Sequence, residues 1–184
     1  MFKSLKKLLK ESFLTALVAV LLVFIVNQLL IEPEQIFGVS MEPALKNAER
    51  VLADKIFYKR GSLKRGDIVV FKSVEDNKSV FVKRVIGLPG ESLMIKEDKI
   101  NIFNDVNPQG FILEEKYLKD SIKTYSGSFL EERKILKIPA EAYIVLGDNR
   151  FKSIDSREWG FLPEEKIIGK IIFRHWPPNR FGFI

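Results

Sequence analysis

The sequence contains no cysteine and only one histidine, His175. Without cysteine the chain can form no disulfide, no thiolate metal cluster and no cysteine nucleophile. A Ser-His-Asp triad, or a zinc site with several histidines, would have to be built around a single histidine. The composition therefore argues against both kinds of site, and we expect neither a metal nor a cofactor.

The net charge of +6 is concentrated near the N-terminus. Residues 1–31 hold four lysines and one glutamate, which is half of the excess, and the other half is spread over the rest of the chain. A nucleic-acid-binding domain would carry its positive charge as a patch on the folded part of the chain. We therefore expect no nucleic-acid partner.

One long hydrophobic run, FLTALVAVLLVFIVNQLLI, covers residues 13–31 without a charged side chain. As a helix that rises about 1.5 Å per residue, it would extend roughly 28 Å, close to the thickness of the hydrocarbon core of a bilayer. A cleaved secretory signal would have a shorter apolar region and a small-X-small site after it, whereas IEPEQIF follows here. We therefore predict one N-terminal transmembrane helix at residues 13–31, with the lipid bilayer as a partner.

The lysines before this run predict the orientation, because positive charge stays in the cytoplasm. Residues 1–12 would form a cytoplasmic basic tail, and residues 32–184 would form an extracytoplasmic domain. We expect a single-pass protein of the inner (plasma) membrane whose folded domain lies on the periplasmic or extracellular face. Ser40 follows Ile31 by nine residues. Even a fully extended chain would therefore keep it within about 30 Å of the membrane surface.

Beyond Glu32, short runs of valine, isoleucine and phenylalanine alternate with Gly, Pro, Asn and Asp, a pattern typical of β structure. We predict a mainly β domain with strands at residues 50–57, 67–72, 80–87, 142–147 and 166–174, and a hairpin at residues 92–103. Residues 104–137 are polar and irregular. We therefore expect a small insertion at about residues 92–137.

Lys83 lies in the predicted strand VFVKRVIG, where alternate residues face opposite sides. Phe81, Lys83 and Val85 therefore share one face, which places the lysine between apolar neighbours. In one interpretation it is a lysine of an edge strand that extends its amine into water. In the other, desolvation lowers the pKa of its amine, and the neutral amine takes a proton from a serine.

Four segments combine polar and turn-forming residues: GVSMEPAL (38–45), RGDIVVF (65–71), FVKRVIGLPGE (81–91) and GDNRFKSIDSREWGF (147–161). Taken singly, each fits a turn or a solvated loop, and Ser40 would be an ordinary turn serine before Pro43. Together, in this order and after a hydrophobic run, they resemble the bacterial type I signal peptidases (leader peptidases) of the peptidase S26 family. The resemblance implies a signal-peptidase-type β catalytic domain. It also implies a membrane-bound serine endopeptidase that removes signal peptides from exported preproteins after small-X-small sites.

The resemblance implies roles for individual residues in these segments. Ser40 would be the nucleophile and Lys83 the general base of a Ser-Lys dyad. The hydroxyl of Ser153 would position the lysine amine, and Asp155 and Arg157 would form the charged pair that braces the loop around it.

The resemblance also implies where a substrate would bind. The oxyanion hole would use the backbone N–H of Ser40. Some family members add the hydroxyl of a serine two residues earlier, and Gly38 occupies that position here, so this side-chain donor is missing. Shallow apolar pockets for small substrate residues would be lined by five side chains, those of Ile36, Met41, Leu45, Phe81 and Val82.

Two other functions stay open. A soluble self-cleaving repressor protease shares the Ser-Lys dyad and a related β core, but it would carry a DNA-binding domain where this chain has its hydrophobic run. A membrane-tethered β module that binds partners without catalysis would have no need of Ser40, Lys83 and Ser153 together.

Overall fold

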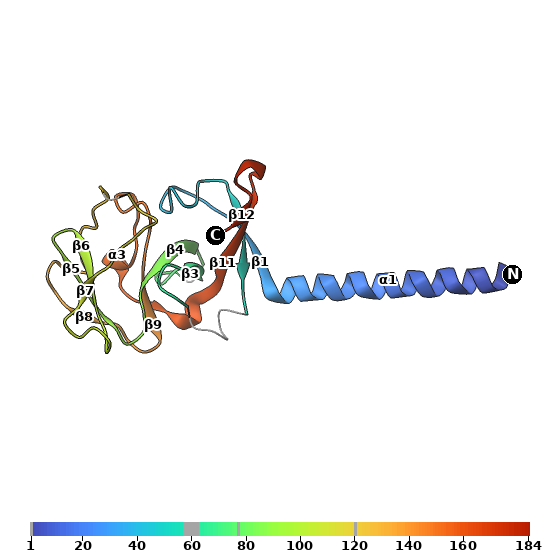
Figure 1. Ribbon diagram of the computed structural model, residues 1–184, viewed down its shortest axis with the longest axis horizontal. Coiled ribbons are helices and arrows are strands. Elements are labelled where there is room, and N and C mark those ends of the chain that lie inside the picture. Colours follow the sequence, from blue (N-terminus) through green and yellow to red (C-terminus); the bar gives the residue numbers. More distant parts are fainter. Residues whose placement is uncertain (1, 57–62, 77, 120) are drawn as a thin grey trace.

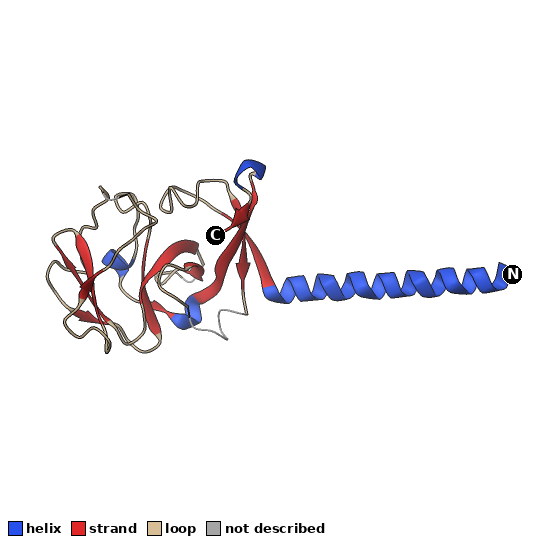
Figure 2. Cartoon of the chain, in the orientation of Figure 1, coloured by secondary structure: helices blue, strands red, loops and turns tan. Residues whose placement is uncertain are grey.

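A computed structural model describes residues 2–56, 63–76, 78–119 and 121–184. A long helix, α1 (Phe2–Leu30), leads into a body built mainly of antiparallel strands (Figures 1 and 2). Among the described residues the further helical segments are short: α3 (Ser156–Trp159), η1 (Glu164–Lys166) and η2 (Pro178–Arg180). The prediction of a mainly β domain is confirmed.

Helix α1 contains almost all of the hydrophobic run, and large apolar side chains along it, including Phe13, Leu14 and Phe24, are exposed. The helix ends at Leu30, one residue before the end of the predicted span. Ile31 belongs to strand β1 (Ile31–Gln35), because its backbone pairs with Asp54 of the next strand. Among the described residues, no helix combines the length and the hydropathy that a membrane crossing requires.

The larger sheet has eight strands, in the order β1-β2-β11-β3-β4-β9-β10 with β12 paired to β11. Its remaining strands are β2 (Arg50–Asp54), β3 (Ile68–Lys72), β4 (Val80–Gly87), β9 (Ala142–Leu146), β10 (Leu162–Pro163), β11 (Ile167–Trp176) and β12 (Gly182–Phe183). All five single strands predicted from the sequence are present. The first of them ends at Asp54, and its predicted last residue, Phe57, lies outside the described residues.

The smaller sheet lies at the end of the body away from α1 (Figure 1) and has the strand order β7-β6-β5-β8. Its strands are β5 (Ser92–Lys96), β6 (Lys99–Phe103), β7 (Phe111–Ile112) and β8 (Leu136–Lys137). β5 and β6 form the predicted hairpin, whose two turn residues, Glu97 and Asp98, both have positive φ. That backbone twist matches the twist of the strands on either side.

Apolar side chains fill both faces of the larger sheet. Along β3, Val69 and Phe71 pack into one cluster, and Ile68 and Val70 pack into another. A third cluster joins the two sheets, and its most buried members are Ile86, Leu93, Ile95, Ile102, Ile138, Ile144 and Leu146. The two sheets therefore share a continuous interior.

The register of β3 and β4 determines the surroundings of Lys83. Lys83 lies opposite Val69 in this antiparallel pair, and opposite residues of such a pair share a face. That face belongs to the cluster that contains Val69, Phe71 and Val85. The sheet thus places a lysine against one of its apolar clusters.

Candidate active site

Ser40 lies on a loop, residues 36–49, that connects β1 to β2. Backbone hydrogen bonds close its two ends, from Ile36 N to Glu49 O (2.8 Å) and from Ala48 N to Ile36 O (2.8 Å). The side chains of Ile36, Met41 and Leu45 are buried in one apolar cluster. Ser40 is therefore held between anchored residues. We call residues 36–49 the nucleophile loop below.

Lys83 is 5% exposed, although its side chain ends in an amine. Burial lowers the pKa of Lys83 from 10.5 to about 8, while the charge of Asp155 opposes that change and the charge of Arg157 adds to it. Its Nζ also lies 6.0 Å from the ring centre of Phe81. Burial is the largest cause, as expected where an ammonium group loses its hydration.

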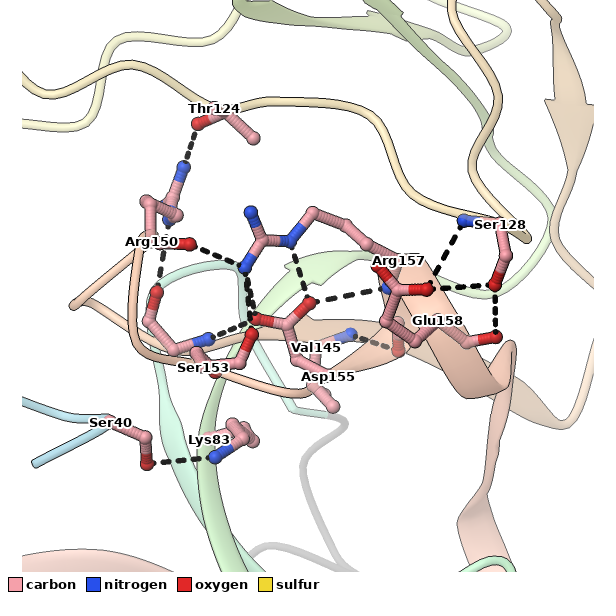
Figure 3. Close-up of polar contacts among 12 residues, drawn as sticks. Ser40, Lys83, Thr124, Ser128, Val145, Arg150, Ser153, Asp155, Arg157 and Glu158 are labelled. Atoms are coloured by element: carbon pink, nitrogen blue, oxygen red, sulfur yellow. Dashed lines mark hydrogen bonds and ion pairs between the residues drawn. The ribbon is translucent and has the colours of Figure 1, made fainter. Parts of the chain in front are cut away.

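The side chains of Ser40 and Lys83 point toward each other, and Nζ lies 2.8 Å from Oγ (Figure 3). A charged amine at this position donates to Oγ, whereas a neutral amine can accept the proton of the Ser40 hydroxyl. The contact joins residues 43 positions apart in the sequence. The arrangement is that of a nucleophile beside a general base.

The backbone N–H groups of Ser40 and Gly38 differ in whether they donate a hydrogen bond within the protein. Within the described part of the chain, the N–H of Ser40 donates no hydrogen bond, so it is free to face an oxyanion. The N–H of Gly38 is engaged, since it donates to Asn47 Oδ1 at 2.9 Å. Gly38 has a φ of 85°, a backbone conformation that favours glycine.

The loop at residues 147–157 contains three of the four predicted supporting residues, and the fourth, Gly38, lies on the nucleophile loop. Asp155 is wholly buried, accepts a hydrogen bond from Gly147 N (3.0 Å) and binds the Arg157 guanidinium through both oxygens (2.8 and 2.9 Å). Arg157 Nη2 also donates to the backbone oxygens of Arg150 (2.9 Å) and Ser153 (3.2 Å). The pair thus fastens the loop to itself, as Figure 3 shows.

Ser153 lies on the same loop as Asp155 and Arg157. Its Oγ is buried and makes no hydrogen bond to any described residue, Lys83 included. The positioning of the lysine amine by this hydroxyl stays a prediction.

Gly147 is a site residue that sequence reasoning missed. A Cβ at this position would lie 2.5 Å from Ser40 O and 2.5 Å from Ser153 Cβ, and would also collide with Ser153 Oγ. A hydrogen bond from Asn149 N to Ser40 O (3.0 Å) holds the two loops together beside it. Only glycine lets the backbone at position 147 come this close to Ser40 and Ser153. In the sequence, the one sign of this role was the position of Gly147 at the start of the GDNR motif.

Arg150 was also missed as a supporting residue. Its side chain is completely buried and forms an ion pair with Glu115, donates to Thr124 Oγ1, and donates to Gly147 O at 3.0 Å. Glu115 and Thr124 come from the polar region 104–137, whose sequence gave no indication of such a contact. That region therefore supports the 147–157 loop.

A second buried ion pair joins β4 to the same loop. Arg84, next to Lys83, binds Asp148 through Nε (2.8 Å) and Nη2 (2.6 Å), and its guanidinium lies 3.9 Å from the ring centre of Tyr117. A bidentate pair of this kind fixes orientation as well as distance. It aligns the strand that carries the amine with the loop that covers it.

The five predicted substrate-binding residues lie on the nucleophile loop and on β4. Four of them, Ile36, Met41, Leu45 and Val82, belong to one apolar cluster. Phe81 is 42% exposed beside Lys83. Contact of these side chains with a substrate stays a prediction.

Known proteins are similar to this chain along most of its length. A family model described as "Signal peptidase, peptidase S26" matches residues 9–176. The chain is 36% identical to signal peptidase IB of Staphylococcus aureus, in an alignment that covers 97% of this chain and 95% of the relative. It is 34% identical to probable signal peptidase I-2 of Synechocystis sp., covering 92% of this chain and 74% of the relative. A crystal structure of a signal peptidase I from Enterococcus faecalis is 30% identical with a TM-score of 0.46, covering 59% of this chain and 95% of that one.

Burial of Lys83 predicts a cost in stability that depends on pH. Below pH 8 the amine is charged in both the folded and the unfolded chain, so the full penalty of burying the charge applies. Between pH 8 and 10.5 only the unfolded chain keeps the proton, so this contribution to stability improves as pH rises. The lowered pKa corresponds to a penalty on the order of 3 kcal/mol.

We expect Lys83→Met to raise the free energy of unfolding at pH 7 by up to that amount, and by much less near pH 10.5. Urea unfolding at both pH values measures this change, with Lys72→Met at the exposed end of β3 as the control. An equal change at both pH values would show that the amine is not held in a desolvated state.

Proposed function

The chain belongs to the signal peptidase family, peptidase S26, and is a serine peptidase; on that premise we propose that Ser40 and Lys83 form its catalytic dyad. Its family acts on exported preproteins that carry signal peptides. The observation that carries the proposal is the 2.8 Å contact between Ser40 Oγ and the buried amine of Lys83.

The proposed reaction is peptide hydrolysis through an acyl-enzyme. Neutral Lys83 takes the proton of the Ser40 hydroxyl while Oγ attacks the scissile carbonyl carbon. The oxyanion that forms is held by the N–H of Ser40, and the Lys83 ammonium returns the proton to the leaving amine as the peptide bond breaks. Lys83 then takes a proton from water, whose oxygen attacks the ester carbonyl carbon. The Lys83 ammonium returns that proton to Ser40 Oγ as the ester bond breaks, which releases the second product and restores the neutral amine.

We propose that the substrate binds as an added strand along β4. Strand β9 pairs with β4 at Arg84, Val85 and Gly87. The first part of β4, residues 80–83, has no such pairing with β9. That part of β4 has a backbone edge beside the dyad, which an extended peptide could join. The apolar cluster that contains Ile36, Met41, Leu45 and Val82 would favour small substrate residues one and three places before the cleaved bond.

We further propose that α1 anchors the protein in the inner (plasma) membrane, with residues 1–12 in the cytoplasm and residues 32–184 outside. The uncharged run of α1, its exposed apolar side chains and the lysines before it support this proposal. β1 starts directly after the helix, so the nucleophile loop would lie near the bilayer. The smaller sheet falls within the proposed insertion, residues 92–137.

Replacement of either dyad residue tests the proposed chemistry. We expect Ser40→Ala and Lys83→Ala each to lower the rate of preprotein cleavage by at least about 10³-fold, because each removes a group that forms or breaks a bond. Cleavage by purified protein in lipid or detergent is the measurement. Ser128→Ala and Lys72→Ala, which change an exposed serine and an exposed lysine, serve as controls. Near-normal cleavage by either dyad variant would refute the assignment.

The close approach at Gly147 gives a second test. We expect Gly147→Ala to lower kcat at least about tenfold, since small misplacements of reacting groups are costly and the new methyl group would press on Ser40 O. Gly169→Ala is the matched control, because its Cβ would also meet a backbone oxygen, that of Asp54 at 2.6 Å, away from the dyad. If both variants lose activity only in proportion to unfolded protein, Gly147 has no special role.

A further inference from the structure

A buried carboxylate that the proposed mechanism does not use lies at the end of the nucleophile loop. Glu49, the last residue of this loop, is 3% exposed. Two arginines from the C-terminal part of the chain meet it: Arg174 Nη1 at 3.2 Å and Arg180 Nη1 at 2.5 Å. Arg174 belongs to β11, and Arg180 ends the short helix η2.

The two guanidinium groups also hold the loop itself. Arg174 Nη1 donates to Ala44 O at 2.9 Å, and Arg180 Nη2 donates to Ala44 O at 3.1 Å and to Pro43 O at 3.3 Å. These carbonyls follow Ser40 by three and four residues. Glu49 in turn accepts a hydrogen bond from Lys46 N at 3.1 Å. The cluster of Glu49, Arg174 and Arg180 therefore forms hydrogen bonds with a backbone N–H and with two backbone carbonyls of the nucleophile loop.

The arginines are themselves fixed in place. Arg174 Nε donates to Arg180 O at 2.6 Å, which ties η2 to β11. Strand β12 pairs with β11 immediately afterwards, with Arg174 opposite Gly182. The C-terminal segment is thus a rigid support and not a tail that happens to lie against the loop.

An ion pair that only stabilises the fold would leave the loop untouched. Lys170 and Asp67 form such a pair, since their 2.8 Å contact joins β11 to the turn before β3 and makes no bond to the nucleophile loop. The cluster around Glu49 differs because its hydrogen bonds end on the loop that carries Ser40. Its partners, more than its burial, indicate what it does.

We propose that Glu49, Arg174 and Arg180 are positioning residues that clamp the nucleophile loop and so hold Ser40 Oγ against Lys83. This inference rests on the proposed function and extends it to the C-terminal segment. Arginine suits the role because one planar group can bind a carboxylate and a carbonyl at the same time.

Loss of the clamp should affect the chemical step more than substrate binding. The amine on β4 stays where it is, whereas the hydroxyl on the loop gains freedom to move away from it. A misplacement of about 1 Å can lower a rate by about 10²-fold. Substrate contacts along β4 would be retained, whereas those of Met41 and Leu45 on the loop would be weakened, so KM should change less than kcat.

The test uses the full chain with Arg180→Met, Arg180→Lys and the matched control Lys170→Met. We expect Arg180→Met to lower kcat for preprotein cleavage at least about tenfold with a smaller change in KM, and Arg180→Lys to recover part of the loss. Hydrogen exchange over residues 41–49 should become faster in Arg180→Met but not in Lys170→Met. Glu49→Gln should reproduce both effects, and it replaces Arg180→Met if that variant does not fold.

Two results would overturn the clamp. One is a kcat for Arg180→Met, corrected for folded fraction, equal to that of Lys170→Met; the other is unchanged exchange over residues 41–49. Failure of the unchanged chain to cleave any preprotein would instead count against the proposed function, and the exchange measurement would still decide whether the loop is clamped.

Discussion

An ammonium group loses favourable hydration when it enters an apolar environment, and the larger sheet imposes this loss on Lys83. Its neighbours on the same face are Val69, opposite it on β3, and Val85, two residues along β4. The environment that makes the charged amine costly also makes the neutral amine available near pH 8. The register of β3 and β4 thus controls the chemistry before any catalytic loop is considered.

A reactive amine is useful only if the serine is held beside it, and Ser40 lies on a loop and not in the sheet. Two other parts of the chain supply the restraint, the 147–157 loop and the C-terminal segment that carries Arg174 and Arg180. Gly147 lets the 147–157 loop lie against Ser40, and the Asp155–Arg157 pair keeps the 147–157 loop folded. The proposed clamp of Glu49, Arg174 and Arg180 holds the nucleophile loop. Asp155, Arg157 and Glu49 are buried and hydrogen-bonded, which suits catalysis by preorganised groups.

The five single strands and the hairpin could be predicted because their determinants are local, whereas the Ser40–Lys83 dyad came from the family resemblance and stays a proposal. Alternation in VFVKRVIG showed the apolar face of Lys83, and the motifs around Ser40 resembled one family. Strand β1 was missed because IEPEQ has neither β-branched alternation nor turn residues around it, and its pairing with β2 is decided by tertiary contact. Ion pairs such as Arg150 with Glu115 join positions 35 residues apart, a proximity that no spacing in the sequence reveals.

The pH dependence of kcat/KM for preprotein cleavage tests most directly whether a desolvated Lys83 amine is the base. Because only the neutral amine accepts the Ser40 proton, activity should rise with pH through an apparent pKa of about 8, where burial places the amine. An acidic limb near the ordinary lysine value of 10.5 would contradict the account, because the amine would then be as well hydrated as one at the surface.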